Sequence, residues 1–361
     1  MAFLAPILPI QPPDRDRTKL AFAEPTAAPL LLETFAFDRS KLEAARERLP
    51  EANATLRQKL AAIRTAAPDQ ADAARREARQ ARDAVRSLVQ GAYTDAGFPR
   101  LDPLARAMVR ARYALFGRWE LNSVCGRDNL GRDILSRIVW GARVSLIVGF
   151  VATLVSLAIG VTYGAVSGYV GGWVDNAMMR VVDVLYSVPF IFIVILLIAF
   201  LSEETTKSRL DAVGVDRITI FYFVVGAIYW LTMARVVRGQ VLSLRNEPFV
   251  EAARALGVSH AGILLRHIVP NLLSVVIVYL TLTIPRVILF EAFLSFLGMG
   301  VEPPDVSWGL LANEGIQVIS PVKTYWWLIL FPSMAIGVTL FALNFLGDAL
   351  RDAFDPKLAG R

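Results

Sequence analysis

The chain has 361 residues, of which 55% are hydrophobic and 19% charged, and its mean hydropathy is +0.48. These values exclude an ordinary soluble domain and predict a protein of the lipid bilayer. Arginines on a helical insertion and on membrane loops explain the net charge of +6, which therefore does not indicate nucleic-acid binding. The single cysteine, Cys125, leaves no pair for an intrachain disulfide and no thiolate cage for a metal.

The first ten residues, MAFLAPILPI, are apolar but too few to span a bilayer, and they lack the charged segment of a signal peptide. Residues 11–125 follow as an insertion. Within it, Asp38–Gln90 is rich in Ala, Arg and Glu, with prolines at Pro50 and Pro68, and it carries apolar residues seven apart, which predicts a helical hairpin. Its charged faces are typical of solvated helices, so a structural insertion is the simplest interpretation. The spaced apolar residues are Leu42, Leu49, Leu56 and Ile63.

Residues 126–143 combine apolar positions on one helical face with arginines elsewhere. Ile134 and Ile138 lie on the apolar face, whereas Arg137 and Arg143 do not. This pattern predicts an amphipathic helix that lies in the membrane interface before the first span.

Residues 144–348 contain five apolar runs that are each long enough for a helix to cross a bilayer. We therefore predict an all-α integral membrane protein with five recognisable transmembrane helices. Pro189, Pro285 and Pro332 fall inside three of the runs and predict kinks, or hinges, which a helix bundle tolerates. The runs are Val144–Tyr169, Val181–Leu201, Ile218–Ala234, Leu272–Leu297 and Tyr325–Leu346.

The first run carries small residues four apart on one face: Ser156, Gly160, Gly164 and Gly168. Such a stripe lets a neighbouring backbone approach closely, and close packing drives helix association in lipid. We expect the three glycines to be helix-packing residues.

Orientation follows from the short connections, because Arg and Lys collect on the cytoplasmic side. The segment Arg235–Asn271 contains five arginines and two acids, so we expect it to be cytoplasmic. Counting spans outward then makes the tail at 349–361 cytoplasmic and residues 11–140 extracytoplasmic.

The cytoplasmic segment at 246–271 has the pattern of a rigid docking element. Pro248 suits a helix start, and Glu251, Ala252 and Ala253 follow in a short helix that Gly257 can end with a left-handed turn. Ser259 can cap a second helix, which we expect to end before Pro270.

The residues Glu251, Ala252, Ala253, Gly257 and Pro270 resemble the EAA loop of permease subunits of bacterial ATP-binding-cassette importers. Further stretches, in order over about Gly126–Lys357, are similar to the dipeptide and oligopeptide branch of that family, and most closely to its oligopeptide permease C subunits. These stretches are GRDNLGRDILSRIVWGARVSL, GYVGGWVDNAMMRVVDVLYSVP, MARVVRGQVLSLRNEPFVEAARALGVS, FEAFLSFLGMGVEPPDVSWG and GDALRDAFDPK.

The resemblance implies a multi-pass permease of the bacterial inner membrane that moves oligopeptides or dipeptides. Nickel or another small solute is the alternative substrate. It also implies that the five EAA-loop residues couple the permease to ATPases. The implied partners are a second homologous permease, two cytosolic ATPases, an extracytoplasmic substrate-binding protein and membrane lipid. No GxxxxGK[ST] loop is present, so we expect a non-catalytic subunit without a cofactor.

Members of the family begin with a full spanning helix, so residues 1–10 resemble a remnant of it. We expect either a reading that begins at an internal methionine or a true five-span chain. The connection Glu204–Arg217 is also longer than the family pattern.

Arg286 and Glu291 are the ionisable residues inside the fourth run, where a charge is costly unless it meets water, protein or a partner. We expect separate environments for them, either on the translocation pathway or at an inter-subunit contact. His260 and His267 are too few ligands for a zinc site, so we predict no metal.

Two other classes compete with this interpretation. A secondary transporter or channel would use the same apolar runs but has no need for an ATPase-docking loop. A membrane-anchored interaction protein would make use of the hairpin at 38–90 but leaves the cytoplasmic segment unexplained.

Overall fold

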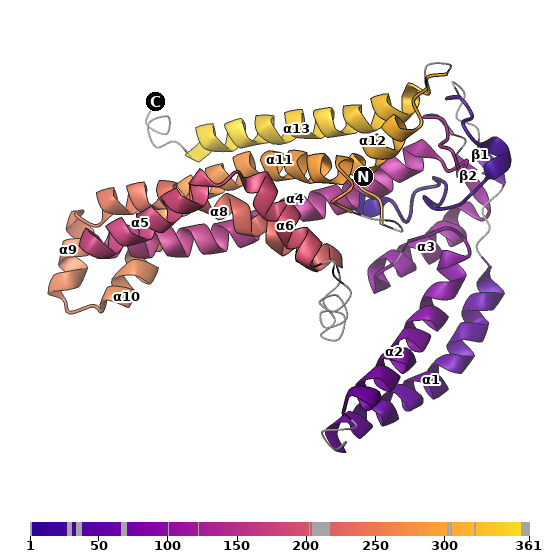
Figure 1. Cartoon of the computed structure of the whole chain (residues 1–361), viewed down its shortest axis with the longest axis horizontal. Coiled ribbons are helices and arrows are strands. Elements are labelled where there is room, and N and C mark those ends of the chain that lie inside the picture. The colour runs from indigo at the N-terminus through magenta and orange to yellow at the C-terminus, as the bar shows by residue number, and fades with distance from the viewer. Residues whose placement is uncertain are drawn as a thin grey trace. The chain divides into compact units, whose positions relative to one another are not determined.

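The computed structural model describes residues 2–26, 31–33, 38–65, 71–99, 101–121, 123–201, 203, 217–301, 303, 305–320 and 323–354 (Figure 1). Our expectations for Pro68, for residues 204–216 and for the end of the tail lie outside these residues. The chain divides into two compact units. The first consists of residues 1–144 and 301–334, and the second contains most of the remainder.

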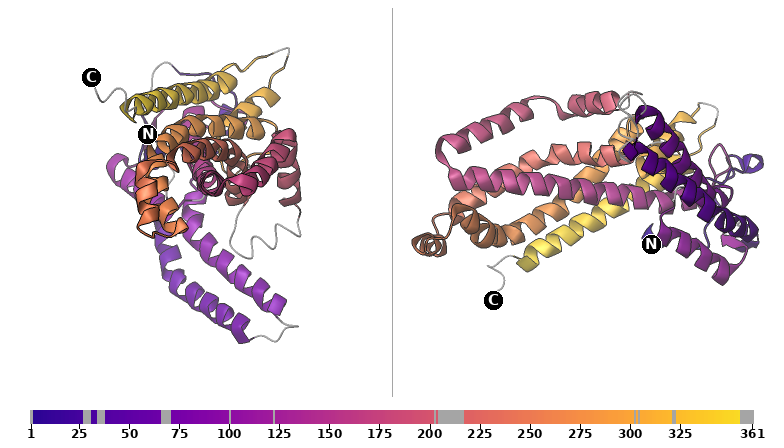
Figure 2. Two further views of the ribbon diagram at one scale, coloured as in Figure 1. Left: turned by 90° about the vertical axis from the view of Figure 1, so that its left-hand side faces the viewer. Right: turned by 90° about the horizontal axis from the view of Figure 1, so that it is seen from below.

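The first unit contains the predicted helical hairpin. Helices α1 (Arg39–Thr65) and α2 (Ala71–Thr94) run side by side in Figure 1 and in both views of Figure 2. An exposed ion pair between Lys59 Nζ and Glu77 Oε2, 2.6 Å long, links the two helices. Pro50 lies inside α1 and does not end it.

Further short elements complete this unit. Helix α3 (Pro103–Phe116) follows the hairpin, strand β1 (Leu31–Glu33) pairs antiparallel with β2 (Trp119–Leu121), and α12 (Trp308–Gln317) joins from later in the chain. Two 3-10 turns, η1 (Ala2–Leu4) and η2 (Thr18–Leu20), precede them.

The N-terminal residues belong to the core of the first unit. Residues 2–10 form one 3-10 turn and irregular chain, with Ala5 and Ile10 buried beside Tyr93, Val109 and Trp140. In the described residues, the apolar character of this segment therefore serves packing within the first unit.

Arginines inside the first unit satisfy buried backbone and carboxylate oxygens. Arg112, 1% exposed, donates from Nε to the Leu8 carbonyl at 2.8 Å and from Nη2 to the Ile10 carbonyl at 3.0 Å. Arg137, also 1% exposed, pairs with Asp128 and Glu314. Burial without partners would be costly, so these contacts hold the loops of the unit in one arrangement.

The structure corrects the expectation of a separate interfacial helix at 126–143. Residues 126–133 form turns closed by a bridge between Arg127 and Asp133, and α4 begins only at Ile134 and runs unbroken to Val170. The Asp133 carboxylate accepts a 2.8 Å bond from the Ser136 backbone N–H, which is the bond of a helix cap. Ile134 is buried, so the apolar face points into the unit.

The second unit is a bundle of long helices. It contains most of α4, then α5 (Gly172–Ser187), α6 (Phe190–Leu201), α8 (Arg217–Leu244), α11 (Leu273–Phe296) and most of α13 (Trp327–Phe354). Three helices among the described residues are long and apolar enough to cross a membrane: Ile134–Val170, His260–Phe296 and Trp327–Ala353. The count of five spans stays a prediction.

The run Val181–Leu201 is not the single helix that we expected. It is divided between α5 and α6 at Val188 and Pro189, and Val188 is extended with φ −89° and ψ 127°. The proline ring disfavours helical geometry in the preceding residue and removes one backbone donor, so the helix ends there. Pro285 and Pro332, by contrast, lie within α11 and α13.

The glycine stripe of α4 faces α8, and the two helices lie side by side (Figures 1 and 2). A Cβ at Gly160 would stand 2.6 Å from Met233 Cβ, and one at Gly164 would stand 2.4 Å from the Ala234 carbonyl oxygen. From the other side, a Cβ at Gly226 of α8 would lie 2.8 Å from the Ala152 oxygen of α4. A side chain at these positions would force the helices apart.

We therefore expect Gly164→Ala to destabilise the second unit by about 1–3 kcal/mol, the usual range for overpacking a tight contact. Gly239→Ala on α8 is the matched control, because no atom lies within 4 Å of its added Cβ. Thermal unfolding of both variants in detergent measures the difference. Equal unfolding temperatures would show that the contact tolerates a methyl group.

A buried carboxyl makes the first unit sensitive to pH. Burial raises the pKa of Asp14 from 3.8 to about 6, against the opposing effect of Arg137 and Arg132, while Asp305 and Glu314 raise it further. Because the folded state holds this proton more tightly than the unfolded state, Asp14 contributes stability below about pH 4. That contribution is lost as the pH rises to about 6.

We expect Asp14→Asn to flatten the fall in stability of the first unit between pH 4 and pH 6, approximately the interval between the two pKa values. Asp16→Asn, at an exposed neighbour, is the control. Hydrogen exchange of the α3 backbone amides, measured across this pH range, reports the stability. Parallel pH profiles for the parent and Asp14→Asn would contradict the assignment.

Candidate functional site

The cytoplasmic segment expected at 246–271 forms a compact helical element. Helix α9 (Pro248–Ala255) starts with a proline at its first position, where no intrahelical N–H is needed. Val250 and Ala253 on its inner face are buried, in one cluster with Ile263, Ile268 and Leu272. Apolar packing therefore fixes one face of α9 to the bundle.

Gly257 ends α9 in a Schellman motif. Its φ is +77°, and its N–H donates to the Arg254 carbonyl while the Val258 N–H donates to the Ala253 carbonyl, both at 3.1 Å. An added Cβ would meet no atom within 4 Å, so only the left-handed backbone requires glycine here.

The second helix of the element starts as expected but ends differently. The Ser259 hydroxyl accepts a 3.2 Å bond from the Gly262 N–H and caps α10 (His260–Ile263). The chain then stays helical through a π turn (Leu264–Ile268) and a 3-10 turn, η4 (Val269–Leu272), into α11. Pro270 lies at the start of the 3-10 turn, where its missing N–H leaves no gap, and Val269 keeps helical angles.

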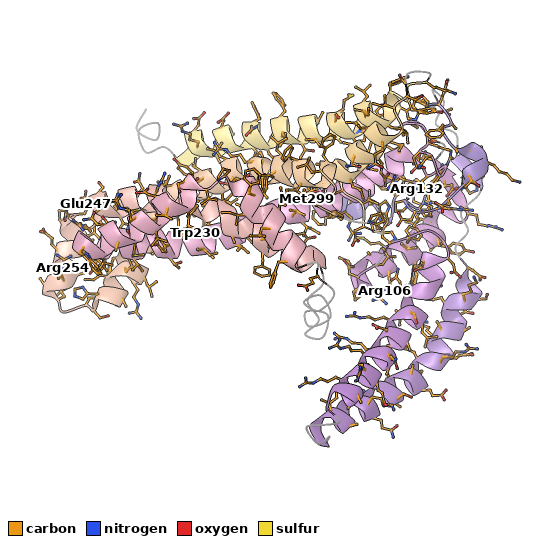
Figure 3. All side chains as sticks on the ribbon, viewed as in Figure 1. Arg106, Arg132, Trp230, Glu247, Arg254 and Met299 are labelled. Carbon is orange, nitrogen blue, oxygen red and sulfur yellow. The ribbon has the colours of Figure 1, made fainter. Side chains whose placement is uncertain are left out.

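The outer face of the element is exposed and mixed in character. Glu251 and Ala252 are exposed, as are the charged Arg254 and the apolar Leu256 and Leu265, which are 84% and 65% exposed. Glu247 and Arg254 mark this end of the helices in Figure 3. Leu256 and Leu265 therefore leave apolar surface open beside the charged side chains of Glu251 and Arg254.

Ionic and polar contacts tie the neighbouring helix ends to each other. Arg238 of α8 donates from Nε and Nη2 to the two carboxylate oxygens of Asp175 on α5, at 2.5 and 2.6 Å. This hydrogen bonding by Arg238 lowers the pKa of Asp175. The Tyr169 hydroxyl lies 3.0 Å from His260 Nδ1, which links α4 to the element. The sequence pattern showed Arg238 only as an orientation charge, because its acceptor lies 63 residues away.

Glu291 and Arg286 lie in different environments. Glu291 is 0% exposed, and its carboxylate accepts bonds from the Ser145 hydroxyl at 3.1 Å and the Ser295 hydroxyl at 2.7 Å. It is therefore an internal link between α4 and α11, which does not favour a contact with another chain. Arg286 is exposed and pairs with no carboxylate in the described part of the chain.

Arg286 also borders a small cavity of about 30 Å³, room for roughly one water molecule. Beside the cavity, the Tyr229 hydroxyl donates a hydrogen bond to the Arg286 carbonyl at 3.3 Å. The other lining residues are Thr232, Met233, Tyr279, Leu282 and Thr283.

Within the described residues, no three His, Cys, Asp or Glu side chains come close enough to hold a metal ion. His260 contacts Tyr169, and the His267 carbonyl accepts a bond from the Asn271 side chain. Both histidines thus make contacts with neighbouring residues of α4 and of the element itself.

The structure shows an exposed helical element between two long helices, α8 and α11, in a chain with candidate membrane spans. The family model described as "binding-protein-dependent transport system inner membrane component" matches residues 160–360, more than half of the chain. The chain belongs to this family, as a permease of the ATP-binding-cassette importer class.

Curated relatives place the match within one branch of that class. The oligopeptide transport system permease protein OppC of Haemophilus influenzae is 47% identical over 64% of this chain and 70% of its own. OppC of Escherichia coli is 49% identical over 64% and 72%, and the dipeptide permease DppC of Bacillus subtilis 43% over 64% and 68%. These matches confirm the resemblance to the dipeptide and oligopeptide branch. A solved chain of the MetNI methionine transporter covers 61% of this chain, at 18% identity and a TM-score of 0.45.

Replacing Gly257 tests the local design of the element. Gly257→Ala should raise the free energy of the element by about 1–2 kcal/mol, because a Cβ disfavours the left-handed turn. Gly257→Asn should cost less, since asparagine tolerates this conformation. Hydrogen exchange over residues 248–263 measures both variants. If both variants exchange at the rate of the parent, the left-handed turn at Gly257 does not limit the stability of the element.

Proposed function

We propose that this chain is a membrane-spanning permease subunit that imports oligopeptides or dipeptides and is coupled to separate ATPases. The supporting observation is the surface of α9, where Val250 and Ala253 pack inward while Glu251 and Ala252 face outward. The substrate class rests on the names of the OppC and DppC relatives.

Coupling would be mechanical. The exposed face of α9 and α10 would sit in a groove of an ATPase, with Glu251 making polar contacts, Ala252 allowing close approach and Leu256 filling apolar space. The buried Ala253 and the turn at Gly257 would keep the element rigid, and Pro270 would mark its junction with the span. Closure of the ATPases would then move α8 and α11 as rigid bodies.

An importer of this kind would assemble from this chain, a second homologous permease, two cytosolic ATPases and an extracytoplasmic substrate-binding protein. ATP hydrolysis would occur only in the ATPases. The proposed orientation places residues 246–271 and the tail at 349–361 in the cytoplasm and residues 11–140 outside, with the permease domain at 144–348.

The residues within the spans would have separate roles. Gly160, Gly164 and Gly168 would hold α4 against α8 during the movement. Arg286, exposed beside a small polar cavity, would face either the translocation pathway or the second permease. Glu291 would keep α4 and α11 together from inside.

A mild-detergent pull-down of the tagged full chain from its native host tests this proposal. We expect mass spectrometry to find a second permease and ATPase subunits with the parent. Glu251→Lys should reduce ATPase retention at least about tenfold, or about 1.4 kcal/mol, because it reverses the charge at the contact. Uptake of a labelled oligopeptide should fall in parallel.

Glu47→Lys is the matched control, because it reverses an exposed charge on α1. It should retain the ATPases and the uptake. Failure to recover any ATPase with the parent would overturn the coupling role. Normal ATPase retention without peptide uptake in the parent would overturn the substrate class alone.

A further inference from the structure

Helix α3 has an apolar face that the described part of the first unit does not cover. One side of α3 is buried through Ala105, Val109 and Arg112. Another side carries Leu104, Met108, Ala111 and Leu115, at the spacing i, i+4, i+7 and i+11 of one helical stripe. Leu104 and Leu115 are 67% and 68% exposed. Met108 and Ala111 between them are half-buried, so the exposed apolar surface of this stripe lies mainly at Leu104 and Leu115, and it is open to an apolar cover.

The charges of α3 are all positive. The helix contains three arginines and no Asp or Glu. Arg106 and Arg110 of α3, with Arg46 of α1, line a groove of about 230 Å³ (Arg106 is labelled in Figure 3). None of these three guanidinium groups pairs with a carboxylate in the described ranges. Leu42, Leu49 and Tyr93 supply apolar lining between them, so the groove suits an anionic group attached to an apolar body.

A contact with α4 indicates the depth of α3 relative to the membrane. Arg143 Nη2 lies 3.4 Å from a carboxylate oxygen of Asp102, the residue that caps the N-terminus of α3. Arg143 directly precedes Val144, where the apolar run of α4 begins. The start of α3 thus lies beside the residue of α4 at which the sequence predicts that hydrocarbon begins.

An aromatic residue follows at the other end of α3. Trp119 is 46% exposed, three residues beyond Phe116. Tryptophan gathers at membrane interfaces, where its ring lies among headgroups and its N–H stays hydrated.

We propose that α3 lies in the membrane interface and binds anionic phospholipid. Leu104 and Leu115 dip into the acyl boundary, while Arg106 and Arg110 meet the phosphate groups. This arrangement has the apolar face and the basic face of an interfacial amphipathic helix. The interfacial element expected at 126–143 is therefore supplied by α3 instead. It anchors the inserted hairpin to the bilayer, independently of what the permease transports.

The proposal is tested by the depth of spin labels in the intact complex, reconstituted in phosphatidylcholine vesicles with phosphatidylglycerol. A Cys125→Ala background removes the only native cysteine, and Leu104→Cys or Leu115→Cys then carries the label. Both leucines are exposed, so the substitutions leave the core intact. Glu47→Cys, exposed on α1, is the water-facing control.

We expect labels at 104 and 115 to be relaxed by dissolved oxygen and shielded from a water-soluble nickel complex, and the label at 47 to show the reverse. Access of the nickel complex at 104 and 115 equal to that at 47 would overturn the proposal. Exclusion of both reagents with an immobilised label would also overturn it, because a protein chain would then cover the stripe.

The contribution of the two arginines to headgroup binding is tested with the double variant Arg106→Gln and Arg110→Gln. Each arginine should contribute about fivefold to the equilibrium between inserted and water-exposed label in vesicles that contain phosphatidylglycerol. In phosphatidylcholine alone, the variant and the parent should match. Equal insertion of the variant and the parent on the anionic vesicles would overturn the headgroup role of the two arginines.

Discussion

The close approach of α4 and α8 is the contact on which the second unit depends. Gly160, Gly164 and Gly168 bring α4 against the backbone of α8, and Gly226 does the same from the opposite side. When two helices associate in lipid, no apolar surface is removed from water, so the hydrophobic effect does not drive them together. Close packing of their backbones holds them instead. The buried Glu291 adds a polar link from α11 to α4 through Ser145. These contacts give the bundle a fixed frame.

The exposed element between α8 and α11 takes its rigidity from that frame. Its inner face is packed by Val250 and Ala253, its turn is set by the left-handed Gly257, and Tyr169 of α4 meets His260. The bidentate pair of Arg238 and Asp175 joins α8 to α5 nearby. Each of these contacts restricts the movement of the element relative to the bundle. The outer face stays free for a partner.

The first unit is built on different physics. Its core is small, and charged side chains share the interior with apolar ones: Arg112 binds two backbone carbonyls and Arg137 joins Asp128 to Glu314. Such networks specify one arrangement of loops because each buried charge needs its own partner. Burial of the Asp14 carboxylate is only partly offset by the nearby Arg137 and Arg132, and its pKa is therefore raised. Helix α3 leaves this unit with an apolar stripe that a bilayer can cover.

The sequence alone determined the features that depend on neighbouring residues. Composition and run length predicted a helical membrane protein, spacing predicted the hairpin and the glycine stripe, and Gly257 and Ser259 marked a helix end and a helix start. The EAA pattern pointed to the family. The structural features among these follow from local backbone preference and from the bilayer thickness, which act over one or two dozen residues, whereas the family came from a resemblance of motifs.

Only the tertiary structure decided the features that join distant segments. Pro189 divides a helix while Pro270 does not, because a π turn and a 3-10 turn absorb the second proline and no such turn precedes the first. Arg238 pairs with Asp175, and Ile134 is buried in the first unit, where residues 134–143 form the start of α4. Partners tens of residues apart are chosen by packing, and no local pattern encodes which of several charged or apolar faces a fold will bury.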